Sequence, residues 1–191
     1  YVLVEATSSA AGTAQRAALE RTLALALEDD EIEDAAIAES EAQRADFWRL
    51  RETIAEAERV DGPALKHDIA VPVAKMPAFI ERVGDAIEAR WAGTSIFAFG
   101  HLGDGNVHFN VRSDDSLARD RLLLLKDEVA SFVHDEVRAQ GGSISAEHGI
   151  GTQKAGELAR LGDPGKLTAM RAVKVALDPN GIMNPGKLFA T

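Results

Sequence analysis

The chain has 191 residues, a formal net charge of -10, no cysteine, and 46% hydrophobic and 27% charged residues. These values are ordinary for a folded globular chain with room for one large or two small domains. The negative charge disfavours nucleic acid as a partner, and the missing cysteines exclude disulfides, thiolate zinc sites and thiol catalysis. No apolar run reaches the roughly 18 residues that a membrane span needs, so we expect a cytoplasmic protein, with peripheral membrane association left open.

The first 71 residues predict three strands and two long helices. Residues 1–6 are typical of a strand already under way, so we expect the chain to be a fragment or to have been cut at a domain boundary. An amphipathic pattern predicts a helix over about 13–27, and an acidic alternating run favours a short strand at 32–37. A second helix is expected over about 40–60, and residues 65–71 form the next expected strand.

The remaining elements alternate helices with short strands around one hairpin. Helices are expected over about 77–91, 117–139, 151–161 and 164–177, with a short strand at 143–146. Strands separated by helices, with one clear hairpin, predict a single α+β domain in which helices cover one face of an antiparallel sheet. The residues contain neither a strand–Gly-x-Gly-x-x-Gly–helix unit nor a Walker loop, so they indicate no nucleotide-binding fold.

The run Gly-His-Leu-Gly-Asp-Gly-Asn-Val-His-Phe-Asn at 100–110 predicts a β-hairpin that brings two histidines together. Its Asp-Gly dipeptide is a strong hairpin signal because both residues tolerate positive φ angles. A two-residue or four-residue loop centred there pairs His101 directly with His108, with Cβ atoms about 4.5–5.5 Å apart on one face. Two such imidazoles can share a metal ion; the alternative is a polar rim of the sheet.

A second run, Ser-Ala-Glu-His-Gly-Ile-Gly at 145–151, puts a carboxylate and an imidazole at a strand-to-helix junction. Glu147 can complete a His-His-Glu set with His101 and His108. Three protein ligands and an open position describe a catalytic divalent site. The alternative is that Glu147 caps the following helix and His148 is a polar turn residue.

The two remaining histidines have different expected surroundings. His134 lies in a charged helical stretch and is expected to face solvent. His67 follows Lys66 in a strand, so alternation sends these two side chains to opposite faces. At most one of them can therefore face a given site.

Three motifs in order carry a family resemblance: the run at 100–110, Ile-Ser-Ala-Glu-His-Gly-Ile-Gly at 144–151, and Leu-Asp-Pro-Asn-Gly-Ile-Met-Asn-Pro-Gly-Lys-Leu-Phe at 177–189. Together they resemble the C-terminal domain of FAD-linked oxidases of the vanillyl-alcohol oxidase superfamily. The nearest branches are D-2-hydroxyglutarate dehydrogenase, D-lactate dehydrogenase and the glycolate oxidase flavoprotein subunit. The resemblance implies that residues 1–191 are a substrate cap domain with ferredoxin-like elements, and that FAD is held mainly by an N-terminal domain absent from this chain.

The resemblance also implies roles for individual residues. In the D-2-hydroxyglutarate dehydrogenase branch the two hairpin histidines and the Glu of the Glu-His pair bind zinc, and these match His101, His108 and Glu147. The adjacent histidine, which matches His148, is the implied general base. The Asn two residues after the second hairpin histidine matches Asn110 and is implied to contact substrate.

An Arg and a Lys fifteen positions apart hold the substrate carboxylate in this family, and Arg51 and Lys66 match that pair. A planar guanidinium suits bidentate binding of a carboxylate, and an ammonium adds a compact charge. The alternative for Arg51 is a surface ion pair with Glu52 or Glu58. Relatives often carry a hydroxyl residue four positions after the Arg, where this chain has Ala55; this departure puts the identity of the substrate in doubt.

The implied reaction is oxidation of a D-2-hydroxy acid to the 2-oxo acid, with hydride transfer to FAD. The implied metal is a divalent ion, and we expect zinc. Asn184 is expected to face the flavin domain, with a simple terminal turn as the alternative. Competing interpretations are a metal-dependent hydrolase, a non-catalytic cap that binds small acids, and a non-redox flavin relative acting on an ether-lipid precursor. The substrate side chain, the electron acceptor and the oligomeric state are not predicted, and a homodimer stays open.

Overall fold

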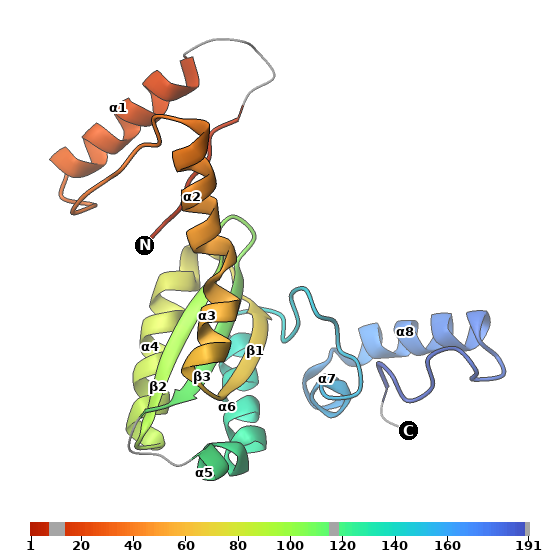
Figure 1. Ribbon diagram of the computed structural model, residues 1–191. Helices are drawn as coiled ribbons and strands as arrows, with labels where there is room; N and C mark the ends of the chain where they lie inside the picture. Colours follow the sequence, from red (N-terminus) through yellow and green to blue (C-terminus); the bar gives the residue numbers. More distant parts are fainter. Residues whose placement is uncertain (8–13, 115–118, 190–191) are drawn as a thin grey trace. The chain divides into compact units, whose positions relative to one another are not determined.

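The computed structural model describes residues 1–7, 14–114 and 119–189 (Figure 1). The chain divides into two compact units, Tyr1–Asp61 and Gly62–Thr191. The first unit is helical in its described residues. It contains α1 (Ala14–Glu28), α2 (Glu41–Glu52) and α3 (Ile54–Asp61).

The prediction of strands at 1–6 and 32–37 is wrong, because both segments lack regular structure. A strand needs a neighbour that takes up its backbone hydrogen bonds, and the described part of this unit offers none. Instead, the carboxylate of Glu5 accepts hydrogen bonds from Arg44 Nε at 2.8 Å and from Trp48 Nε1 at 2.6 Å. Side-chain contacts therefore tie the N-terminal segment to α2.

Both helices expected in this unit form, with one correction. The helix expected over 13–27 is α1, although residue 13 lies outside the described residues. The helix expected over 40–60 is divided at Thr53 into α2 and α3. The Thr53 hydroxyl donates to the carbonyl of Arg49 at 2.9 Å, and such back-bonding competes with the helical ladder. Ser40 caps the start of α2 by accepting the N–H of Gln43.

The second unit is built on a three-stranded antiparallel sheet with the order β1-β3-β2. Its strands are β1 (Ala64–Ala70), β2 (Thr94–His101) and β3 (Asn106–Ser113). Its helices are η1 (Val73–Lys75), α4 (Met76–Arg90), α5 (Arg119–Leu124), α6 (Lys126–Ala139), α7 (Ala155–Leu161) and α8 (Pro164–Leu177). The predicted α+β fold with a helix-covered antiparallel sheet is confirmed.

Two expected elements of this unit differ from the structure. The helix expected over 117–139 is two helices, α5 and α6, that meet at Leu125, and its residues 117–118 lie outside the described part. The strand expected at 143–146 is reduced to one bridge between Ala70 and Ser143. Beyond this bridge the chain leaves the sheet, because serine hydroxyls within 143–149 satisfy backbone groups locally.

One face of the sheet forms the core. Figure 1 shows α4 and α6 lying along that face, and both helices contact the sheet. Phe79 of α4 packs edge to face on Phe109 of β3, with ring centroids 5.8 Å apart. The core is formed by apolar side chains of the sheet, α4 and α6: Leu65, Ile69, Val107, Phe109, Val111, Phe79, Val83, Ile87, Val129, Val133 and Val137. The opposite face of the sheet carries the polar side chains of β1 and β3 together with Phe97 and Phe99 of β2.

The expectation that His134 faces solvent is wrong, because its residue is only 3% exposed. Its Nδ1 lies 2.9 Å from Oε2 of Glu157 on α7, and Arg160 holds the same carboxylate. The Arg160 hydrogen bond is the main reason that the pKa of Glu157 falls to about 2. α7 therefore contacts α6 at His134, and the local helical pattern does not reveal this contact.

The buried imidazole of His67 predicts acid-sensitive stability. Burial lowers the pKa of His67 to about 4, whereas unfolded histidine titrates near about 6.5. Between these values the unfolded chain binds more protons, so the free energy of unfolding falls as the pH falls from about 6.5 to 4. We expect His67→Gln to remove up to about 3 kcal/mol of this pH dependence, measured by urea unfolding at pH 7 and pH 4.

The matched control for this prediction is Thr94→Val, which changes a buried polar side chain that does not titrate. It should leave the difference in unfolding free energy between the two pH values as large as in the original chain. An unchanged difference in His67→Gln would show that His67 is not a source of the acid sensitivity.

Candidate active site

The face of the sheet opposite the core carries most of the predicted site residues. The strand register pairs Lys66 with Asn110 and Asp68 with His108. Paired residues share a face, and so do residues two apart along a strand. These four side chains therefore lie on one face, while His67 points to the opposite side and is buried in the core. The predicted separation of Lys66 from His67 is confirmed.

The expected direct pairing of His101 with His108 is wrong. His101 pairs with Asn106, and His108 pairs with Phe99. The register is shifted by two residues relative to the predicted one. Because strand side chains alternate with a period of two, this shift keeps both histidines on the same face, as diagonal rather than direct neighbours.

The shift arises from the loop, which spans residues 102–105 and is centred one residue earlier than expected. The Asp104 carboxylate accepts the N–H of Asn106 at 2.9 Å, a side-chain turn that starts β3 at Asn106. Gly105 has a φ of 78°, and a Cβ there would collide with the carbonyl oxygen of Val71. Its own carbonyl accepts the N–H of Val71, so contact with the end of β1 fixes the loop.

The loop after α6 brings Glu147 to both hairpin histidines. The Oε1 atom of Glu147 lies 3.7 Å from Nε2 of His101, and its Oε2 atom lies 3.8 Å from Nε2 of His108. Ligands of a tetrahedral zinc ion at about 2.1 Å lie about 3.4 Å from one another. Two imidazole nitrogens and a carboxylate are also the donor types that zinc prefers. The donor types of the three predicted residues therefore suit a divalent ion. Among the described residues, however, the group whose potential ligand atoms all lie within 4.8 Å of one another is Asp68, His108 and His148.

His148 lies beside this group with its imidazole two-thirds exposed, at 66% for the side chain. Its ring centroid is 5.8 Å from that of His108. Glu147 and His148 are consecutive residues of the loop, and both side chains lie near His108.

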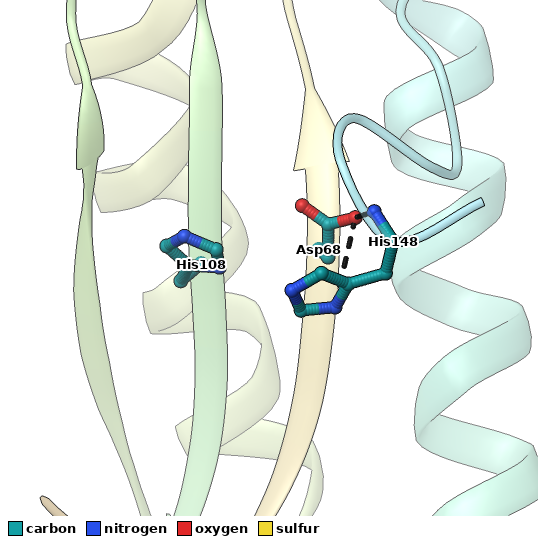
Figure 2. A group of neighbouring side chains, drawn as sticks. All are labelled: Asp68, His108 and His148. Atoms are coloured by element: carbon teal, nitrogen blue, oxygen red, sulfur yellow. Dashed lines mark hydrogen bonds and ion pairs between the residues drawn. The ribbon is translucent and has the colours of Figure 1, made fainter. Parts of the chain in front are cut away.

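Asp68 is a member of the site that the sequence reasoning missed. Figure 2 shows it on β1, between His108 on β3 and His148 on the adjoining loop. Potential ligand atoms of these three residues all lie within 4.8 Å of one another. Alternation supplied a signal, because a strand that presents Lys66 to the site presents Asp68 to it as well.

The carboxylate of Asp68 is held in its charged form. Burial by itself raises the pKa of Asp68, but the backbone N–H groups of His148 and Glu147 outweigh this effect and bring the pKa below its ordinary value. Both groups donate to Oδ2, at 2.8 Å from His148 and 2.9 Å from Glu147. A buried negative charge is thus kept at the edge of the site.

The structure separates the predicted substrate residues into two groups. Lys66 is exposed on β1 beside Asn110, which is only 2% exposed on β3. Arg51 lies in the last turn of α2, in the first unit, and is half-buried. Asn184 is exposed in the C-terminal segment, which the N–H of Leu188 ties to the carbonyl of Gly151 at 2.9 Å.

Comparison with known families identifies the class of protein to which this fold and site belong. A family model described as FAD linked oxidases, C-terminal domain, matches residues 1–188. The chain belongs to this family. The predicted resemblance is therefore confirmed, and family membership implies FAD as the cofactor of the reaction.

Among its relatives, the chain is similar to D-2-hydroxyglutarate dehydrogenase of Stutzerimonas stutzeri (strain A1501), with 37% identity over 190 residues. This alignment covers 100% of the chain and 40% of that protein. The mitochondrial D-2-hydroxyglutarate dehydrogenase of Bos taurus is 36% identical over 194 residues, covering 100% of the chain and 34% of that protein. D-lactate dehydrogenase of Anaerostipes hadrus is 37% identical over 160 residues, covering 81% of the chain and 32% of that protein.

The chain thus spans 40% or less of the length of these relatives. The names of several relatives include a mitochondrial location, so the cytoplasmic location stays a prediction. The likeness to the glycolate oxidase flavoprotein subunit and the presence of zinc also stay predictions. Among the described residues, no helix is both long and apolar enough to cross a membrane.

Proposed function

We propose that this chain is the substrate- and metal-binding domain of an FAD-dependent dehydrogenase that oxidises a D-2-hydroxy acid to the 2-oxo acid. The observation that carries the proposal is the position of the Glu147 carboxylate between Nε2 of His101 and Nε2 of His108. The shared sheet face of Lys66 and Asn110 supports it, since a substrate carboxylate needs a cation close to the reacting carbon.

Substrate binding is assigned to residues of matching charge and hydrogen-bonding capacity. Arg51 and Lys66 bind the C1 carboxylate, the first through a planar fork and the second through a compact ammonium. Asn110 is buried on β3, so its amide is rigidly held and orients the substrate beside His108. Ala55 leaves out a hydroxyl that relatives often supply, which favours a substrate side chain that differs from theirs.

In the chemical step the substrate hydroxyl loses a proton and C2 loses a hydride. A divalent ion held by His101, His108 and Glu147 would supply Lewis acidity that makes the substrate hydroxyl easier to deprotonate. His148 takes up the hydroxyl proton as general base, a role for which imidazole is suited near neutral pH. FAD, when bound, would supply the acceptor for the hydride from C2, while the residues of this chain hold the substrate in place and take up the hydroxyl proton, so that the 2-oxo acid is the product.

The experiment that tests this proposal is a substrate screen of the full-length flavoprotein with an artificial electron acceptor. The candidates are D-lactate, D-2-hydroxyglutarate, D-malate and glycolate, each against its L enantiomer where one exists. We expect reduction of the flavin by at least one D-2-hydroxy acid and little reduction by the matching L acid. Hydrolytic activity of the isolated chain without flavin would favour a metal-dependent hydrolase instead.

A prediction about substrate binding follows from the exposed ammonium of Lys66. We expect Lys66→Met to raise KM for the best substrate by about 10–100-fold, because a hydrogen bond to a charged group contributes about 1.5–3 kcal/mol. The fall in kcat should be smaller than the rise in KM. Steady-state kinetics would measure both values, with Lys166→Met on the exposed surface of α8 as the matched control. An unchanged KM would remove Lys66 from the binding site.

A further inference from the structure

Asp68 makes several hydrogen bonds to the segment that carries Glu147 and His148. It is 4% exposed, and its Oδ2 accepts the consecutive N–H groups of Glu147 and His148. Its backbone carbonyl accepts the N–H of Ala146 at 3.4 Å and the ammonium of Lys154 at 3.1 Å. One residue of β1 thus binds this loop at residues 146–148 and again at Lys154.

The position of β1 explains why this residue can do so. β1 is an edge strand of the sheet, so one side of its backbone has no strand neighbour among the described residues. The segment after α6 takes that place through two hydrogen bonds between Ala70 and Ser143, at 2.8 and 2.9 Å. Past Ser143 the segment has no regular structure, and Asp68 provides its next attachment to the sheet. Without this attachment the loop would have few fixed points before α7 begins.

We propose that Asp68 is a positioning residue of the site: its carboxylate fixes the Glu147–His148 peptide, so that both side chains are held beside His108. This inference rests on the proposed function, since it assumes that Glu147 binds the ion and His148 accepts the proton. Asp68 acts through these two residues and not on the substrate.

The geometry favours this role over direct binding of the ion by Asp68, although its carboxylate lies near His108 and His148. Oδ2 already accepts two N–H groups, and Oδ1 accepts a hydrogen bond from Asn106 Nδ2 at 3.4 Å. A carboxylate offers about four acceptor positions, so three are already in use. A carboxylate that accepts successive backbone N–H groups is also a familiar way to fix a loop.

The two roles predict different results for two substitutions. Asp68→Asn keeps an oxygen that can accept the N–H groups of Glu147 and His148, whereas Asp68→Ala removes it and leaves two N–H groups without this acceptor. An amide is a much poorer ligand for a divalent cation such as zinc than a carboxylate is. Asparagine should therefore rescue a positioning residue but not a metal ligand.

The experiment uses the full-length flavoprotein with Asp68→Asn, Asp68→Ala and Glu147→Gln. Hydrogen exchange of the Glu147 and His148 amides reports the attachment of the loop, independently of metal and turnover. Competition with a chelator gives the Kd for Zn²⁺, and the visible spectrum of the Co²⁺-loaded protein reports the ligand geometry. Asp178→Ala is the matched control, because Asp178 is also buried and accepts the consecutive N–H groups of Ile182 and Met183.

For Asp68→Ala we expect amide exchange at least about tenfold faster and a Kd for Zn²⁺ about 10–100-fold higher. For Asp68→Asn the Kd should stay within about tenfold of the original, with an unchanged Co²⁺ spectrum. Glu147→Gln should lose the metal while its amide exchange stays slow. Asp178→Ala should change neither reading at 147–148.

Two results would overturn the inference. One is unchanged exchange and unchanged Kd in Asp68→Ala; the other is loss of metal in Asp68→Asn as complete as in Glu147→Gln, which would make Asp68 a ligand. If Asp68→Ala does not fold, the comparison of Asp68→Asn with Glu147→Gln still decides between rescue and loss. If the original protein binds no divalent metal, the proposed function fails, while the exchange measurements still test the attachment by Asp68.

Discussion

Replacing His148 by alanine in the full-length flavoprotein is expected to lower kcat by about 10²–10⁴-fold, the usual contribution of a general base. The physical reason is that the substrate hydroxyl then has no positioned group to accept its proton. The imidazole is two-thirds exposed, with its Nδ1 3.8 Å from Oδ2 of Asp68, whereas the backbone N–H of His148 donates to the same oxygen at 2.8 Å. Loss of the side chain should therefore leave the loop, the flavin content and the metal content unchanged.

The measurement combines steady-state kinetics with the flavin absorbance and the metal content of the same sample. His148→Gln serves as a second variant, because it retains a polar side chain of similar length without a basic nitrogen. Turnover near the original value in both variants would remove His148 as the base. Turnover lost together with flavin would instead indicate a structural role.

Replacing Glu147 by glutamine is expected to lower the bound metal from about one ion per chain to near zero, and kcat by at least about 100-fold. Glutamine has the same shape but no negative charge, so the ion loses the one anionic ligand among the three proposed. The N–H of residue 147 still donates to Asp68, so the fold of the loop should persist. Elemental analysis and turnover before and after chelation would measure both effects.

The matched control is Glu81→Gln, which removes an exposed carboxylate from α4. It should retain full metal content and full turnover. If the original protein contains no divalent metal and its turnover is insensitive to a chelator, the proposed metal site is wrong. The His101, His108 and Glu147 cluster would then be a polar rim of the sheet.

Strand alternation was a stronger guide to the site than turn chemistry was. The Asp-Gly dipeptide predicted a hairpin and a shared face for His101 and His108, and the hairpin forms with both on one face. The pairing itself differs by two residues, because the Asp104 carboxylate and the contact of Gly105 with Val71 fix a different loop. A contact with β1 lies outside any pattern within the hairpin.

Failures of the sequence reasoning occur where a distant segment covers or pairs a residue. His134 has a charged helical neighbourhood, yet it is buried, with Glu157 of α7 at its Nδ1 and the His67 ring beside it. Residues 1–6 have the composition of a strand, but the described part of their unit provides no strand to pair with. Burial and strand pairing are properties of two segments, and a local pattern describes only one of them.

The sequence by itself determined the family, the α+β class, the helices from α4 to α8 in outline, and the face of the sheet on which Lys66 and the hairpin histidines lie. These depend on motif identity and on side-chain periodicity, which are local. Only the tertiary structure placed Glu147 between His101 and His108 and brought Asp68 to the Glu147–His148 peptide. That placement depends on how a loop without regular structure docks on an edge strand, through hydrogen bonds between residues far apart in the chain.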